Sequence, residues 1–263
     1  MPHTKVIPLA LVTIVAWAQP AASAVKKVPY PEVKATLAEA FKPDAGFNAM
    51  HKAFADAVAK KDAKALFALV GPTFVWRSGG VLVDQFDLGA SAVQNFKVVF
   101  GFRAAGAKTD GGVDDGPYWD TLASFAEDST FFTPEDTENL VCSPTTADVA
   151  DEDVFEQAER KIGDDAVWYV TLAETPVAKA PGDTGAPIAT VGTVVMPMLS
   201  SYPPSTNDKA PPKTTHFEVL LPSGKSGWVP ASAARPFDSD RLCYAKTESG
   251  EYKIVAYDES ESE

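Results

Sequence analysis

The stretch from His216 to Pro230 constrains the fold more than any other part of this 263-residue sequence. Within residues 216–221 every second side chain belongs to one apolar face, which is the period-two pattern of a half-buried β-strand. The Pro-Ser-Gly-Lys run at 222–225 has the chemistry of a turn, and residues 227–229 begin a return strand. We therefore predict a β-hairpin around which a small β-domain is built.

Further strand patterns precede this hairpin at the spacing of a small barrel. They cover residues 167–171, 175–180 and 188–198. The strand, Pro-Ser-Gly-Lys turn and Gly-Trp-Val return within 216–230 resemble the distal hairpin of the bacterial Src homology 3-type domain, a small barrel found in exported cell-envelope proteins. The resemblance implies an SH3-like barrel over residues 164–237 that serves as a targeting module. It assigns no binding residues, because Lys179 and the Ser/Pro-rich insertion at 199–213 depart from the family pattern.

Residues 44–163 show mainly helical patterns. The first helix is marked by apolar side chains at spacings of three and four: Phe47, Met50, Phe54 and Val58. Strand patterns at 73–77 and 81–86 flank a Ser-Gly-Gly turn and predict one β-hairpin. The order of helix, short helix and strand resembles the start of nuclear transport factor 2-like domains. The predicted fold class is therefore α+β, a mainly helical N-terminal region with a β-hairpin, followed by a small SH3-like β-barrel.

The two ends of the chain differ from its folded parts. Residues 1–24 combine a lysine, an apolar run and a terminal small-residue motif, which is typical of a cleaved secretory signal peptide. We predict a linker at 25–43, a terminal β-hairpin at 238–257 and a disordered acidic tail at 258–263. The sequence leaves open whether the last hairpin belongs to the barrel or to a sheet of the N-terminal region.

Two cysteines, Cys142 and Cys243, follow the signal peptide. An even pair in a chain that reaches an oxidising compartment predicts one disulfide. The 36 acidic residues outnumber the 23 basic ones, for a net charge of −13, which argues against nucleic acid as a partner. No apolar run after the signal peptide is long enough to span a membrane. We therefore predict a periplasmic or secreted protein.

Motifs for catalysis or metal binding are sparse. His51 lies beside the apolar face of a helix and His216 begins a strand, so a structural role is favoured over a general base for both. Zinc-ligand spacing and glycine-rich phosphate loops are absent from the sequence. Acid clusters within 110–115 and 148–153 do not follow the calcium-loop pattern and are interpreted as solvated loop acids. We predict no metal and no cofactor.

Aromatic residues carry the binding hypothesis. Tyr202, Phe217 and Trp228 are predicted to line one side of the barrel and to stack on sugar rings or a peptide. The alternative for Phe217 and Trp228 is burial in the core, whereas Tyr202 in its proline-rich loop is expected to be exposed. The expected function is non-catalytic binding of peptidoglycan or an envelope protein. The alternative is a cell-wall hydrolase with a carboxylate pair in the N-terminal region.

Overall fold

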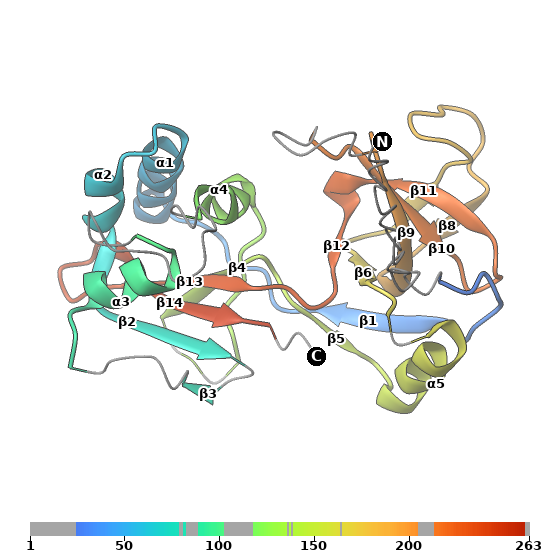
Figure 1. Ribbon diagram of the computed structural model, residues 1–263, viewed down its shortest axis with the longest axis horizontal. Coiled ribbons are helices and arrows are strands. Elements are labelled where there is room, and N and C mark those ends of the chain that lie inside the picture. The colour runs from blue at the N-terminus through green and yellow to red at the C-terminus, as the bar shows by residue number, and fades with distance from the viewer. Residues whose placement is uncertain are drawn as a thin grey trace, which may run out of the picture.

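The chain folds into two lobes that lie side by side (Figure 1). The computed structural model describes residues 25–78, 81–82, 89–102, 118–135, 137, 139–163, 165–204 and 213–260. We call α1–α4 with β2–β4, β13 and β14 the first lobe, and β1, β5–β12 and α5 the second lobe. The chain passes between the lobes repeatedly, because β1 and β5 of the second lobe are separated in sequence by helices and strands of the first.

The sheet of the first lobe combines strands from the middle and the end of the chain, in the order β3-β2-β14-β13-β4. These strands are β2 (Val70–Ser78), β3 (Val81–Leu82), β4 (Leu140–Ser143), β13 (Arg241–Lys246) and β14 (Tyr252–Glu259). β2 and β14 run parallel, whereas the other neighbours are antiparallel. The terminal hairpin β13–β14 therefore belongs to the sheet of the first lobe, which decides the alternative that the sequence left open.

Four helices accompany this sheet: α1 (Ala45–Ala59), α2 (Ala63–Phe67), α3 (Ala92–Val99) and α4 (Trp119–Glu127). Asp44, Asp62 and Ser91 begin the first three, each accepting a hydrogen bond from a backbone N–H in the first turn. The apolar faces of the helices pack with the inner side of the sheet. The core includes the fully buried side chains Phe47, Phe54, Leu66, Phe96, Leu122, Tyr244 and Ile254.

The main sheet of the second lobe is antiparallel, in the order β11-β10-β9-β1-β5, and β6 pairs with both β9 and β12. Its strands are β1 (Val33–Leu37), β5 (Ala147–Val149), β6 (Trp168–Thr171), β9 (Val194–Tyr202), β10 (His216–Leu220), β11 (Ser226–Pro230) and β12 (Ala234–Pro236). A short 3-10 turn at Ala231–Ala233 connects β11 to β12, and α5 (Glu152–Ile162) packs on the lobe. A separate two-stranded ladder joins β7 (Thr175–Val177) to β8 (Ala189–Val191).

The predicted fold class is wrong. The described chain is mostly β, with fourteen strands and five α-helices, rather than a mainly helical region followed by a small barrel. The strands β13 and β14 turn the supposedly helical region into a five-stranded sheet. Within the described residues the second sheet does not close into a barrel, because its path runs on from β9 to β1 and β5. These pairings join residues far apart in sequence, such as Val33 and Val195, and local periodicity does not reveal them.

Residues from the predicted linker and from the predicted acidic tail lie in strands. β1 lies within residues 25–43, the segment predicted as a linker, and Asp258 lies in β14 although the sequence assigned it to the tail. The Asp258 carboxylate accepts two hydrogen bonds from Arg77, at 2.7 and 2.8 Å. The predicted signal peptide at 1–24 lies outside the described residues. Among the helices that the structure describes, none is long and apolar enough to cross a membrane.

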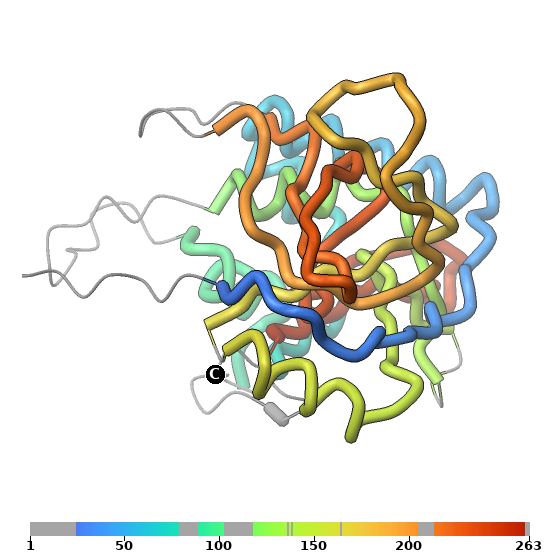
Figure 2. The backbone as a smooth tube through the Cα atoms, turned by 90° about the vertical axis from the view of Figure 1, so that its right-hand side faces the viewer, coloured from blue at the N-terminus to red at the C-terminus, as the bar shows by residue number. Residues whose placement is uncertain are grey.

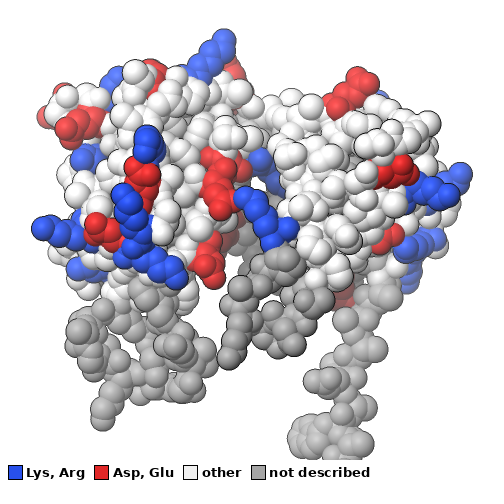
Figure 3. All heavy atoms as spheres, turned by 90° about the horizontal axis from the view of Figure 1, so that it is seen from above, with Lys and Arg blue, Asp and Glu red and all other residues white. Residues whose placement is uncertain are grey.

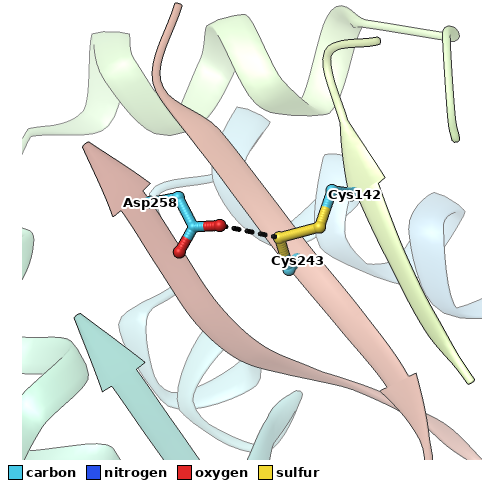
Figure 4. Close-up of side chains that lie close together, drawn as sticks. All are labelled: Cys142, Cys243 and Asp258. Atoms are coloured by element: carbon cyan, nitrogen blue, oxygen red, sulfur yellow. Dashed lines mark hydrogen bonds between the residues drawn. A yellow bond between two sulfur atoms is a disulfide. The ribbon is translucent and has the colours of Figure 1, made fainter. Parts of the chain in front are cut away.

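The predicted disulfide between Cys142 and Cys243 is confirmed (Figure 4). The two residues face each other across β4 and β13, with their Cα atoms 4.1 Å apart. Both are buried, and they pack in a small cluster with Phe132 and Ala256. The bond closes a loop over a sequence separation of 101 residues, so it holds the last hairpin against the middle of the chain. A disulfide at this position is consistent with an oxidising compartment.

Candidate functional site

The candidate site begins on the outer face of the three strands β9, β10 and β11. Side chains alternate between the two faces of a strand, so the register fixes which of them share the outer face. Two cross-strand rows do so: Tyr202, His216 and Pro230 in one, and Ser200, Glu218 and Trp228 in the next. The structure therefore brings Tyr202 and Trp228 together, as the sequence analysis proposed.

Phe217 lies on the opposite face. Its ring packs against Tyr169, with the ring centroids 4.6 Å apart, beside the core cluster that includes Val219 and Val229. Phe217 pairs with Val229, whereas Glu218 pairs with Trp228, so Phe217 and Trp228 cannot line the same surface. Of the three predicted ligand-binding residues, two form one surface and the third packs with the core.

The loop between β7 and β8 makes the second wall of a groove of about 250 Å³ above this face. It projects from the upper edge of the second lobe in Figure 2, where it is drawn in gold. The loop contributes Ala178, Pro187 and residues 182–185, β7 contributes Pro176, and the sheet contributes His216, Trp228 and Pro230. Most of these groups are apolar side chains or backbone atoms. A ligand in the groove would therefore contact mainly apolar surface, with few hydrogen-bonding side chains.

Two backbone hydrogen bonds hold the loop on the sheet. Ala178 N donates to Trp228 O and Trp228 N donates to Ala178 O, both at 2.8 Å. Gly227 permits this approach, because a Cβ atom at that position would lie 2.5 Å from Val177 Cγ1. The glycine beside Trp228 is therefore needed for close packing of β7 on β11.

Tyr202 and Trp228 form an aromatic corner beside the groove. Their ring centroids lie 6.2 Å apart with the planes at 85°, an edge-to-face arrangement. Tyr202 is 45% exposed, and Trp228 is half-buried. Large aromatic rings that face solvent together, rather than the core, are typical of a binding surface.

Glu218 lies next to Trp228 on the same face and is already engaged. Burial favours its neutral form, but hydrogen bonds from Ser226 and Ser200 and the charge of Lys27 together lower the pKa of Glu218 below its ordinary value. Ser200 Oγ donates to Glu218 Oε2 at 3.0 Å, and Lys27 Nζ lies 3.4 Å from Oε1. The carboxylate is therefore ionised and held in place, and it stabilises the sheet surface on which Trp228 rests.

A second hollow, of about 410 Å³, lies where the two lobes meet. Figure 3 shows acidic and basic side chains along this junction. Arg235 of β12 donates to Asp128 Oδ2 at 3.0 Å and to Thr130 Oγ1 at 2.6 Å, and Tyr257 donates to Asp240 Oδ2 at 2.6 Å. Burial and this hydrogen bond to Asp240 raise the pKa of Tyr257 above its ordinary value. The carboxylates of the hollow thus hold the lobes and the chain end together.

The other acidic residues, the histidine and the cysteines considered in the sequence form no further site among the described residues. Asp151 begins α5 by accepting a hydrogen bond from Val154 N at 3.2 Å. His51 packs between aromatic rings of the first lobe, with its ring centroid 5.0 Å from that of Phe131. The acid cluster within 110–115 lies outside the described residues. Cys142, Cys243 and Asp258 lie close together, but both sulfur atoms belong to the disulfide.

The part of the groove that the β7–β8 loop supplies was not predicted from the sequence. His216, interpreted from the sequence as structural, lines the groove together with Gly182 and Asp183, for which no binding role was predicted. The available signal was the density of proline and glycine between two short strands that directly precede the predicted hairpin. Pairing of β7 with β11 could not be derived from that signal alone.

Comparisons with known proteins find no match to any family model, curated protein or solved structure. They therefore lend no support to the resemblances to Src homology 3-type and nuclear transport factor 2-like domains.

Proposed function

We propose that this protein is an exported, non-catalytic binding protein of the cell envelope, and that the groove beside Trp228 is its binding site. The observation that carries the proposal is the aromatic corner of Tyr202 and Trp228 at the edge of a preformed groove. Binding sites are typically concave and mostly apolar, with a few polar groups that fix orientation. The ligand is peptidoglycan or an envelope protein.

Two observations support a place outside the cytoplasm. The disulfide Cys142–Cys243 suits an oxidising compartment, and residues 1–24 have the pattern of a secretory signal peptide. A periplasmic or secreted protein meets the cell wall and other envelope proteins directly. N-terminal sequencing of the extracytoplasmic form should begin at Val25, and an intact Met1 in that fraction would contradict export by cleavage.

The structure favours binding in the groove over catalysis there. Glu218 pairs with Trp228 across the strands, and its two oxygens already accept from Ser200 and Lys27, so it is held as an ionised structural group. Prolines and backbone make up most of the remaining wall. A mostly apolar groove can hold a sugar ring or an extended peptide without changing it.

Co-sedimentation with purified peptidoglycan tests the proposal. The mature protein should sediment with the wall and release no soluble muropeptides, and the Trp228→Ala and Tyr202→Ala variants should remain in the supernatant. Tyr118→Ala is the matched control, because Tyr118 is similarly exposed, at 48%, but lies in the first lobe. Release of muropeptides would favour the cell-wall hydrolase instead. If the protein stays soluble with peptidoglycan but is retained by immobilised envelope proteins, the ligand is a protein.

A further inference from the structure

We propose that the groove recognises a primary ammonium group on a peptide, of the kind that a lysine side chain carries; this inference rests on the proposed function of the groove as a binding site. Tyr202 and Trp228 present two ring planes at 85°. The face of an aromatic ring attracts a cation, most strongly for tryptophan, and two rings at a corner can contact one ammonium group together.

The same chemistry already operates elsewhere in this chain. Lys246 Nζ lies 5.1 Å from the centroid of the Tyr252 ring and 3.3 Å from Asp44 Oδ2. An aromatic face and a carboxylate thus hold one ammonium group between them. In the described part of the chain, lysines lie over Phe67 and Tyr252, and no lysine or arginine lies over Tyr202 or Trp228.

The lining of the groove also includes a carboxylate that can pair with an ammonium group. Asp183 is the only acidic residue among the described residues that line it. Asp183 Oδ1 accepts a hydrogen bond from Gly185 N at 2.8 Å, which orients the carboxylate within the loop, and Oδ2 accepts none from the described residues. Asp183 is exposed, so it can approach an incoming ammonium group without breaking an existing ion pair.

Charge favours a cationic ligand over an anionic one. Lys27, which contacts β10 and β11 of this face, is paired with Glu218 at 3.4 Å and donates to Ser226 Oγ at 3.3 Å. Its charge is therefore balanced by Glu218. The described lining of the groove holds one carboxylate, Asp183, and no lysine or arginine; the exposed Lys179 of the same loop is not part of that lining. The chain as a whole carries a net charge of −13, which attracts cations and repels anions at long range.

The test uses two capped tripeptides, Ala-Lys-Ala with a free side-chain amine and the same peptide acetylated on that amine. Each is titrated into the full mature protein at neutral pH, and binding is followed through the indole N–H resonances in the ¹H–¹⁵N spectrum. The free amine should bind about tenfold more tightly than the acetylated form. Equal affinities, or no shift of any indole resonance with either peptide, would overturn the inference.

Asp183→Asn is the decisive variant, because asparagine keeps the oxygen that accepts from Gly185 N and loses only the charge. It should weaken binding of the free amine about threefold and leave the acetylated peptide unaffected. Asp153→Asn is the control, since it removes the same charge from the exposed first turn of α5, away from the groove (Figure 1). If both variants lose the same affinity for the free-amine peptide, the loss comes from the net charge of the protein, which would contradict a site at Asp183.

Peptidoglycan whose free amines have been acetylated separates the two proposals. If it sediments the protein as well as untreated peptidoglycan does, the proposed function stands and recognition of an amine is refuted. If neither form sediments the protein but the free-amine tripeptide binds through Asp183, recognition of the amine stands and the envelope ligand must be a lysine-bearing protein.

Discussion

Replacement of Gly227 by alanine tests the packing that creates the groove. An added Cβ atom would lie 2.5 Å from Val177 Cγ1, 2.7 Å from Ile188 Cδ1 and 3.0 Å from Ala178 O. The Ile188 side chain is 44% exposed and can rotate away. Val177 is fully buried and β-branched, so its strand must shift. The clash therefore falls on β7 and on the two hydrogen bonds that attach the loop to Trp228.

Insertion of one methyl group into a packed contact costs about 1–3 kcal/mol. Because two of the three neighbours of the new Cβ resist displacement, we expect a loss of about 2 kcal/mol, which lowers the Tm by about 4–8 °C. Differential scanning calorimetry of the mature protein measures this shift. The variant should also lose binding in the groove, since β7 supplies one of its walls.

Gly192→Ala is the matched control for this prediction. No heavy atom lies within 4 Å of a Cβ at Gly192, and its φ is outside the left-handed region. The control should leave the stability unchanged or raise it by about 0.4–1 kcal/mol, because alanine restricts the unfolded chain. If Gly227→Ala has the Tm of the unmodified protein, β7 does not pack on β11 as described, and the groove has no second wall.

Tyr202→Ala should change the free energy of unfolding by less than about 0.5 kcal/mol in urea denaturation, because the ring is exposed; a loss several times larger would show that the ring is packed. The double replacement Cys142→Ala and Cys243→Ala should lower the free energy of unfolding by up to about 4.7 kcal/mol through loop entropy, and an unchanged urea midpoint would contradict this. Burial lowers the pKa of His51, so the unfolded chain binds a proton at this residue more readily than the folded chain does. The contribution of neutral His51 to stability is therefore fully present above pH about 6.5 and should be lost as the pH falls through the pKa that His51 has in the folded protein. His51→Phe should flatten this part of the stability profile, and an unaltered profile would assign the slope to other groups.

Local patterns in the sequence identified individual elements well. The spacing of Phe47, Met50, Phe54 and Val58 predicted a helix, and α1 buries all four side chains. The alternation over 216–230 predicted a hairpin, and β10 and β11 pair over that stretch. Both signals come from residues close in sequence, whose periodicity depends only on the geometry of the element itself.

Pairing between distant strands could not be predicted in the same way. Val33 pairs with Val195 and Ala256 pairs with Val75, and nothing in the four local segments specifies these partners. The predicted barrel failed for this reason, because the strand that extends the sheet comes from a segment whose prolines and lysines suggested a linker.

The strand register of the candidate site could have been predicted from the sequence. A four-residue turn after Leu221 aligns Glu218 with Trp228 and Phe217 with Val229. This register alone separates Phe217 from Trp228 and assigns it to the core face. By contrast, the approach of Asp183 and Pro187 to the hairpin depends on the β7–β8 loop folding over the sheet, and only the structure reveals that wall of the groove.

The most direct test of the central claim locates ligand binding on the protein. Soluble muropeptides are titrated into the ¹⁵N-labelled mature chain, and shifts are mapped onto the two hollows. We predict that the largest shifts occur at the Trp228 indole N–H and at the backbone amides of Tyr202 and Asp183, with the muropeptides recovered unchanged. Shifts centred on Asp128 and Asp240 between the lobes, or cleavage of the muropeptides during the titration, would contradict a non-catalytic groove on the second lobe.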